Sequence, residues 1–235
     1  MTLLPAIELE TGANPDATVI WLHGLGADGN DFAPIVPELR LPKSAHIRFI
    51  FPHAPAIPVT VNGGFVMPAW YDILEMEIDR KVDTSQLLQS AARIGDFITR
   101  ELERGIDSAR IIIAGFSQGG AVAYQVALSH TLPLGGLLAM STYFATADTI
   151  ILSRENKNIP ITIQHGIYDP VVPETLGQKA TTQLVKAGYS VNYKNYPMEH
   201  AVCPEQITDI GNWLQKLLLY LNPALREQRK NIYNV

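Results

Sequence analysis

The chain of 235 residues contains a single cysteine, Cys203. One thiol excludes an intrachain disulfide framework and any site that needs several thiolates, and it is typical of a reducing compartment, so we expect a cytoplasmic protein. No uninterrupted apolar stretch approaches the roughly eighteen residues that a membrane-spanning helix needs. The first residues also lack the basic and apolar segments of a signal peptide, which again favours the cytoplasm.

An excess of positive charge is also missing. The chain has 18 lysine and arginine residues against 23 aspartate and glutamate residues, a formal net charge of −5. This balance offers no basic surface for a nucleic-acid backbone, so no nucleic-acid partner is expected. Internal repeats and linkers rich in glycine, serine or proline are absent as well. We therefore expect one domain over residues 1–221, followed by a tail at 222–235 that frays.

What the chain does contain is an alternation of strands and helices. Runs rich in β-branched residues predict strands at 17–22, 46–51, 110–114, 134–140, 159–164 and 190–196. Apolar periodicity predicts helices at 30–40, from the N-cap candidates Thr84 and Ser85 to just before Gly105, at 117–130, at 174–187 and from about Ile207 to Leu221. Several strands are apolar without alternation, as in a parallel sheet covered on both faces. The pattern predicts an α/β fold with a mostly parallel sheet, whose ligands bind beyond the carboxyl ends of the strands.

A G-x-S-x-G motif, Gly115–Gly119, stands between one of these strands and a helical segment. In that context the motif predicts a sharp strand-to-helix turn that exposes the Ser117 hydroxyl, while the two glycines leave room beside it. The turn also directs a helix N-terminus and the Gln118 N–H at an oxyanion that forms there. The alternative is a glycine-rich helix start in which Ser117 is an ordinary N-cap.

A serine nucleophile needs a base, usually a histidine that a carboxylate orients. Of the six histidines, His200 is the best placed, since it lies in the loop between the last strand and the last helix. We expect His46 and His130 to be surface or structural residues. Asp169 follows the preceding strand, where an Asp-Pro pair alone indicates only a turn. The order Ser117, Asp169, His200 is the chain order of α/β-hydrolase triads, and it favours a catalytic role for all three.

The loop after the first predicted strand supplies a second N–H for the oxyanion, which we assign to Leu25. The same loop contains a G-x-G-x-x-G pattern at Gly24–Gly29, which leaves a dinucleotide-binding alternative open. That alternative expects an acid at the end of the next strand, but the nearest downstream carboxylate is Asp72. Neither zinc-protease nor calcium-loop spacing occurs, and we interpret Cys203 as a small buried residue. No metal and no cofactor are expected.

Six ordered segments together resemble the phospholipase/carboxylesterase family of α/β-hydrolases, which includes bacterial carboxylesterases and the acyl-protein thioesterases. The segments are 23–26, 51–55, 69–72, 115–120, 165–169 and 199–200, and the resemblance runs from about residue 18 to residue 221. It implies an α/β-hydrolase fold without a large lid domain and without a cofactor. It also implies Ser117, Asp169 and His200 as the triad, with the Leu25 and Gln118 amides as the oxyanion hole. Trp70 matches the family's aromatic residue beside the acyl site.

Residues 53–84 have no clear period and are too long for an ordinary connection, so they predict a functional loop. We expect Phe65, Met67 and Trp70 to line an apolar groove for an acyl chain; the alternative is a hydrophobic patch under a long loop. The predicted function is hydrolysis of carboxylic esters or thioesters through an acyl-enzyme. The substrate would be a small or lipid-like ester, or an acylated protein, and the enzyme a monomer or homodimer. The alternatives are an NAD-binding oxidoreductase and a non-catalytic binding protein of the same fold.

Overall fold

A twisted sheet of seven strands lies at the centre of the computed structural model, which describes residues 3–75 and 80–220. In spatial order its strands are β1 (Ala6–Glu10), β3 (Ile47–Pro52), β2 (Ala17–Leu22), β8 (Ile111–Phe116), β9 (Gly136–Met140), β10 (Ile161–Gly166) and β11 (Val191–Tyr196). All neighbours pair in parallel except β1, which runs antiparallel to β3. The six parallel strands are the six that the sequence predicts, each within two residues at either end. The α/β class is confirmed.

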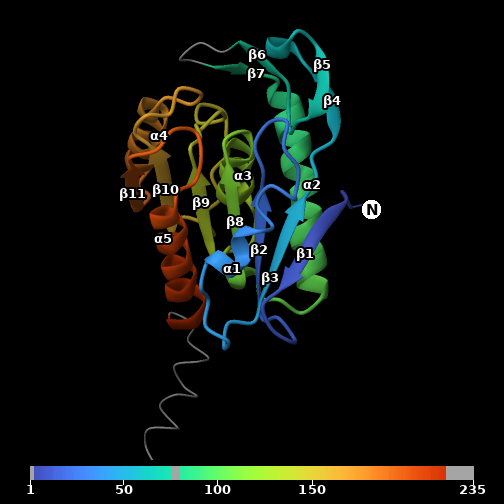
Figure 1. The fold of residues 1–235 in the computed structure, drawn as a ribbon, viewed down its shortest axis with the longest axis vertical. Helices are drawn as coiled ribbons and strands as arrows, with labels where there is room; N and C mark the ends of the chain where they lie inside the picture. Colours follow the sequence, from blue (N-terminus) through green and yellow to red (C-terminus); the bar gives the residue numbers. More distant parts are fainter. Residues whose placement is uncertain (1–2, 76–79, 221–235) are drawn as a thin grey trace, which may run out of the picture.

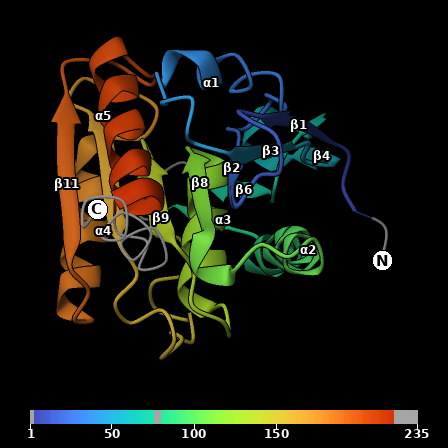
Figure 2. The same ribbon diagram turned by 90° about the horizontal axis from the view of Figure 1, so that it is seen from below.

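Helices cover both faces of this sheet (Figures 1 and 2). α2 (Thr84–Glu103), α3 (Gln118–Ser129) and α4 (Glu174–Lys186) pack on one face, and α1 (Ile35–Glu38) and α5 (Pro204–Gln215) on the other. Successive strand residues serve opposite faces: Ile20 belongs to the core under α2, α3 and α4, whereas Val19 belongs to the core under α1 and α5. Every residue of β2 is buried, which explains why its sequence shows no polar alternation.

Several predicted helix limits differ from the observed ones. The helix expected at 30–40 is only the four residues of α1, because Pro34 and Pro37 lack the N–H groups that a longer helix would use. The N-cap of α2 is Asp83, whose carboxylate accepts a hydrogen bond from the Gln86 N–H at 2.9 Å, not Thr84 or Ser85. Gly105 follows that helix with a φ of +88°, the left-handed conformation expected after a helix end.

The last predicted helix begins earlier than expected, at Pro204, and continues after α5 as a π-helical segment, η3 (Lys216–Tyr220). Residues 221–235, and with them the expected tail, lie outside the described residues. Within residues 3–75 and 80–220, no helix combines the length and apolar character needed to cross a membrane.

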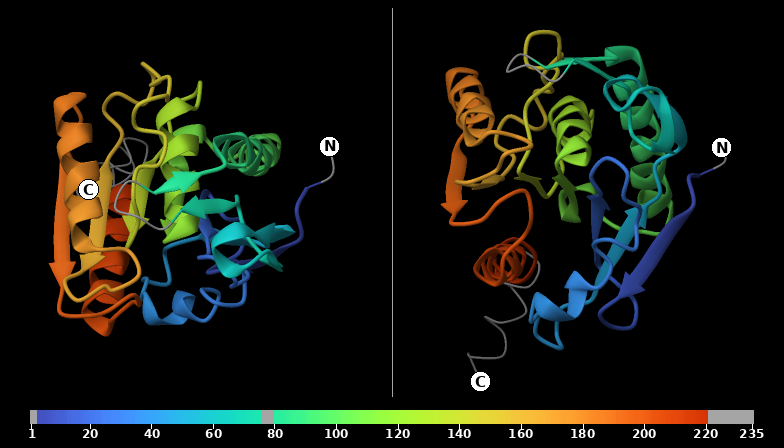
Figure 3. Two further views of the ribbon diagram at one scale, coloured as in Figure 1. Left: turned by 90° about the horizontal axis from the view of Figure 1, so that it is seen from above. Right: turned by 45° about the horizontal axis from the view of Figure 1, so that its top comes forward.

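The described part of the long segment, residues 53–75 and 80–84, forms two small hairpins rather than an irregular loop. β4 (Ala56–Val59) pairs with β5 (Phe65–Pro68), β6 (Ile73–Glu75) pairs with β7 (Lys81–Val82), and the short helix η1 (Thr60–Asn62) joins β4 to β5. Both hairpins lie beyond the carboxyl ends of the parallel strands (Figures 1 and 3). The two hairpins therefore lie next to the edge of the sheet at which a site is expected.

Candidate active site

Ser117 lies at the sharp turn between β8 and α3. Its φ of 53° and ψ of −121° form a strained conformation for a residue with a side chain. The turn is too tight for another Cβ, because an alanine in place of Gly119 would put its methyl group 2.5 Å from the His23 carbonyl oxygen. The hydroxyl of Thr142 donates to the Ser117 carbonyl at 2.6 Å and helps to hold the strained residue. The strand-to-helix turn that the sequence predicts around Ser117 is present in the fold.

The three residues that the sequence singles out lie within hydrogen-bonding distance of one another. His200 Nε2 is 2.9 Å from Ser117 Oγ, and His200 Nδ1 is 2.6 Å from Asp169 Oδ2. Because an ionised carboxylate only accepts, Nδ1 carries the proton and Nε2 accepts the serine hydroxyl. The second carboxylate oxygen of Asp169 accepts the N–H groups of Val171 and Val172 at 2.9 and 2.8 Å. A continuous chain of hydrogen bonds, here called the relay, thus runs from the Asp169 carboxylate through the imidazole to the serine hydroxyl.

The carboxylate of Asp169 is fully buried and yet ionised. Burial alone would raise the pKa of Asp169, but hydrogen bonds from His200 and from the Val172 and Val171 amides outweigh it, so the pKa lies below its ordinary value. The ring of Phe116 packs against the ring of His200 with 4.7 Å between their centroids. Packing on one side and the carboxylate on the other fix the imidazole in one orientation.

A second histidine, His165, supports the loop that carries Asp169. It is fully buried, and its Nε2 lies 2.8 Å from the Val172 carbonyl oxygen and 3.8 Å from Asp169 Oδ2. Burial lowers the pKa of His165 despite the opposing effects of the Val172 carbonyl and Asp169, so the ring is neutral and donates to that carbonyl. Sequence reasoning assigned no role to this residue. Its signals in the sequence were its place in the segment 165–169 and its position four residues before Asp169.

The Leu25 and Gln118 N–H groups are available for a ligand. Within the described residues, neither N–H donates a hydrogen bond to the protein, and both residues line the cavity beside Ser117. An added Cβ on Gly24 would lie 3.4 Å from the Ser117 Cβ, so the loop that contains Leu25 passes directly beside the serine. Gln118 is the first residue of α3, where the helix dipole also favours negative charge.

A cavity of about 430 Å³ adjoins these groups. Its apolar lining comes from Leu25, Ala27, Val61, Ile73, Phe116 and Val171, and its charged lining from Asp31 and Arg80; His200 also lines it. Val61 and Ile73 belong to the segment between β4 and β6, so part of the long segment does face the site. The sequence did not predict Val61 and Ile73 as lining residues, because elements of three residues, such as η1 and β6, are too short to show which side chains face the cavity.

The groove predicted from Phe65, Met67 and Trp70 is not where the cavity lies, since none of the three lines it. Phe65 is 73% exposed on the outer side of β5, and Met67 is half-buried. Trp70 is 1% exposed, and its indole N–H donates to the His23 carbonyl at 2.9 Å. A buried indole needs an acceptor for its N–H, and here the acceptor is the His23 carbonyl inside the protein, so the side chain points inward.

Comparison with known proteins agrees with this geometry. Residues 6–218 match the phospholipase/carboxylesterase family. The chain belongs to this family. It is 37% identical to acyl-protein thioesterase 1 of Neurospora crassa over 227 residues, which cover 92% of this chain and 91% of the relative. It is 35% identical to acyl-protein thioesterase 1 of Cryptococcus neoformans over 224 residues, 86% of this chain and 92% of the relative.

A solved structure of a related protein agrees with the family match. The crystal structure of Zea mays acyl-protein thioesterase 2 superposes with a TM-score of 0.80 at 29% identity and covers 92% of this chain and 99% of its own. The protein is thus an α/β-hydrolase that cleaves esters or thioesters, and the predicted family, fold and reaction class are confirmed.

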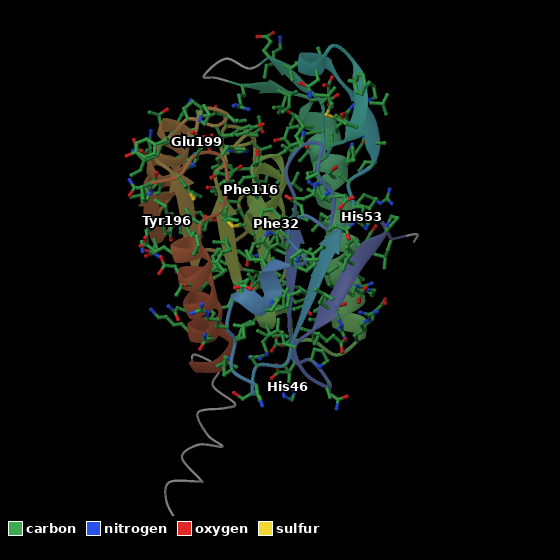
Figure 4. The ribbon with its side chains drawn as sticks, viewed as in Figure 1. Phe32, His46, His53, Phe116, Tyr196 and Glu199 are labelled. Carbon is green, nitrogen blue, oxygen red and sulfur yellow. The ribbon has the colours of Figure 1, made fainter. Side chains whose placement is uncertain are left out.

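The other candidate features lie outside this site. His46 is at the lower end of the molecule in Figure 4, well away from Phe116 and Glu199, which are the neighbours of Ser117 and His200 in the chain. No helix begins at the end of the Gly24–Gly29 loop, since α1 starts only at Ile35, so the loop lacks the helix N-terminus that a dinucleotide phosphate needs.

Cys203 is half-buried at the start of α5, not fully buried as expected. Among the residues that the structure describes, no group of three or more histidine, cysteine or acidic residues could hold a metal ion.

Proposed function

We propose that Ser117 is the nucleophile, His200 the general base and acid, and Asp169 the residue that orients the imidazole. His200 Nε2 takes the hydroxyl proton as Ser117 Oγ attacks the acyl carbonyl, and the carboxylate stabilises the imidazolium. The Leu25 and Gln118 N–H groups stabilise the oxyanion. His200 then protonates the departing alcohol or thiol, and a water that the same ring deprotonates releases the acid from the acyl-enzyme. The continuous relay of hydrogen bonds from Asp169 to Ser117 carries this proposal.

The cavity supports a substrate with one acyl chain. Its volume of about 430 Å³ lies toward the lower end of the range for ligand sites, and six of its lining side chains are apolar. These features favour a small or lipid-like monoacyl ester or thioester over a bulky triglyceride. The relatives named acyl-protein thioesterases extend the proposal to acylated proteins. We place the reaction in the cytoplasm, which the single cysteine favours, and assign it no cofactor.

Replacement of the proposed nucleophile tests the mechanism. Ser117→Ala should lower kcat/KM for an activated ester by several orders of magnitude, and the protein should no longer react with a fluorophosphonate probe. Circular dichroism and thermal unfolding provide the control for folding. A variant that keeps full activity would overturn the assignment.

An acyl-length series tests the substrate class. Matched oxygen esters and thioesters from acetyl to palmitoyl, with a common leaving group for each series, should show kcat/KM rising with chain length until the cavity is full. The same rise in both series means that the cavity holds the acyl part. A flat response would place the acyl chain outside the cavity and refute the monoacyl proposal.

A further inference from the structure

The proposed donor of Leu25 is one half of a peptide group whose other half is the Gly24 carbonyl. A trans peptide is planar, and its C=O and N–H point in opposite directions. Whatever holds the Gly24 oxygen therefore decides where the Leu25 N–H points. In this structure His23 holds it, with Nδ1 at 2.7 Å from the Gly24 oxygen. Since a carbonyl only accepts, the proton must be on Nδ1.

The other ring nitrogen of His23 fixes this tautomer. The Ala54 N–H lies 3.1 Å from His23 Nε2, and because an amide N–H only donates, Nε2 carries no proton. The side chain is buried, with 1% of the residue exposed. Burial lowers the pKa of His23, although the Gly24 carbonyl acts in the opposite direction, so the ring stays neutral. Two backbone groups thus select one neutral tautomer, with its donor directed at Gly24.

The position of His23 is in turn tied to the nucleophile turn. The Trp70 indole N–H donates to the His23 carbonyl at 2.9 Å, and the two rings lie 5.0 Å apart. The Trp70 backbone N–H donates to Gln118 Oε1 at 2.9 Å, and Gln118 Nε2 donates to the Tyr71 carbonyl at 2.6 Å. Gln118 carries the second proposed oxyanion N–H on its own backbone. A chain of hydrogen bonds therefore connects the two loops that supply the Leu25 and Gln118 donors.

We propose that His23 is the positioning residue of the oxyanion hole, and that Trp70 and the Gln118 side chain keep it in register with Ser117. The ring touches no substrate, since it does not line the cavity. It orients the Gly24–Leu25 peptide so that the N–H faces the oxygen of an acyl group bonded to the serine. The hydrogen bond to the Gly24 carbonyl also polarises that peptide and strengthens its N–H as a donor. This inference rests on the proposed function of Ser117.

The matched variants His23→Asn and His23→Leu test the inference. The Asn side chain can place its amide nitrogen near the position of Nδ1 and keep the donor, whereas Leu fills similar space without one. We expect His23→Leu to lower kcat by about 10- to 100-fold, less than the roughly 10²- to 10³-fold loss for a deleted oxyanion donor, because the peptide still visits the productive orientation. KM should change little, and His23→Asn should regain most of the rate.

Two measurements separate positioning from a general loss of structure. Rates are expressed per active site, counted by complete fluorophosphonate labelling, so that misfolded protein does not contribute. The inhibition constant of a trifluoromethyl ketone, which forms an oxyanion on the serine, should rise in His23→Leu by the same factor by which kcat/KM falls. If the rate per active site and the ketone affinity both match the wild type, the inference is overturned.

Trp70→Phe is the second variant, for use if His23→Leu does not fold. It keeps an aromatic ring but removes the N–H that holds the His23 carbonyl, together with part of the buried indole, and we expect a several-fold loss of kcat with a matching loss of ketone affinity. Unchanged values in this variant count against the inference. Ser117→Ala distinguishes the two levels: if it is inactive while the His23 and Trp70 variants behave as wild type, only the positioning role fails. If Ser117→Ala remains active, the proposed function fails together with the positioning role.

Discussion

Replacing Asp169 with asparagine reverses one hydrogen bond and leaves the shape of the site unchanged. The new carbonyl oxygen can still accept the Val171 and Val172 N–H groups, which lie 2.9 and 2.8 Å from Asp169 Oδ1. The amide nitrogen then takes the place of the oxygen that is 2.6 Å from His200 Nδ1. Because that nitrogen donates, Nδ1 must accept, and the ring proton moves to Nε2. A protonated Nε2 cannot take the proton of Ser117.

The size of the effect distinguishes two explanations. A hydrogen bond to a charged group contributes about 1.5–3 kcal/mol, so the loss of that bond alone would slow the reaction by roughly 10- to 150-fold. Loss of the productive tautomer adds to this, and the two together should lower kcat by about 10⁴-fold, or close to 5 kcal/mol. The expected value for Asp169→Asn is therefore well beyond what one hydrogen bond explains.

The assay is steady-state hydrolysis of an activated ester, with active sites counted by fluorophosphonate labelling. Asp209→Asn is the matched control. The Asp209 carboxylate, on α5, accepts hydrogen bonds from the Lys194 and Tyr196 side chains of β11 and makes no contact with the relay. It should keep the wild-type kcat. If Asp169→Asn stays within about tenfold of wild type, the tautomer argument is wrong.

Three further predictions concern stability. Gly119→Ala should lower the free energy of unfolding by several kcal/mol, and Tm by about 2–4 °C for each kcal/mol, because the new Cβ would stand 2.5 Å from the His23 carbonyl oxygen. An unchanged Tm in calorimetry would contradict this. Glu101→Ala removes a fully buried carboxylate that is 2.6 Å from Arg48 and should cost about 3 kcal/mol in urea unfolding, with kcat per active site unchanged; a loss below about 1 kcal/mol would contradict this. The pKa of His165 is lowered, so as the pH falls below about 6.5 the unfolded chain binds a proton that the folded chain does not. Stability should therefore fall with pH by up to about 1.4 kcal/mol per unit, and His165→Gln should reduce that slope in urea titrations, whereas an unchanged slope would mean that His165 does not contribute to it.

The sheet and the relay could be predicted because their signals are local. Strands such as β2 and β8 are short apolar runs whose residues are all buried, so composition alone indicates where they lie. Ser117 is identified by glycines that a tight turn requires and by the strand before it. Asp169 and His200 follow from topology, since parallel strands bring the loops after their carboxyl ends to one edge. None of these inferences needs a side-chain orientation.

The hairpins of the 53–84 segment could not be predicted in the same way. β7 has only two residues and β6 three, too few to show an alternation of apolar and polar side chains. β1 was missed because it lies at the edge of the sheet, where none of its residues is fully buried and two of its five residues are glutamates. In both cases the position depends on contacts with distant residues rather than on local pattern.

Trp70 shows how a correct motif can be given the wrong role. An aromatic residue in a long segment near the site predicts an apolar wall, but the structure satisfies its N–H with a carbonyl 47 residues away, at His23. Its N–H then holds the backbone of the proposed oxyanion loop, and we expect chain-length selectivity to come from cavity-lining side chains such as Val61 and Ile73. Trp70→Phe should therefore lower kcat/KM by a similar factor for every acyl length. Ile73→Ala, which enlarges the cavity, should shift the preferred length upward, and a uniform response to that variant would show that the acyl chain lies elsewhere.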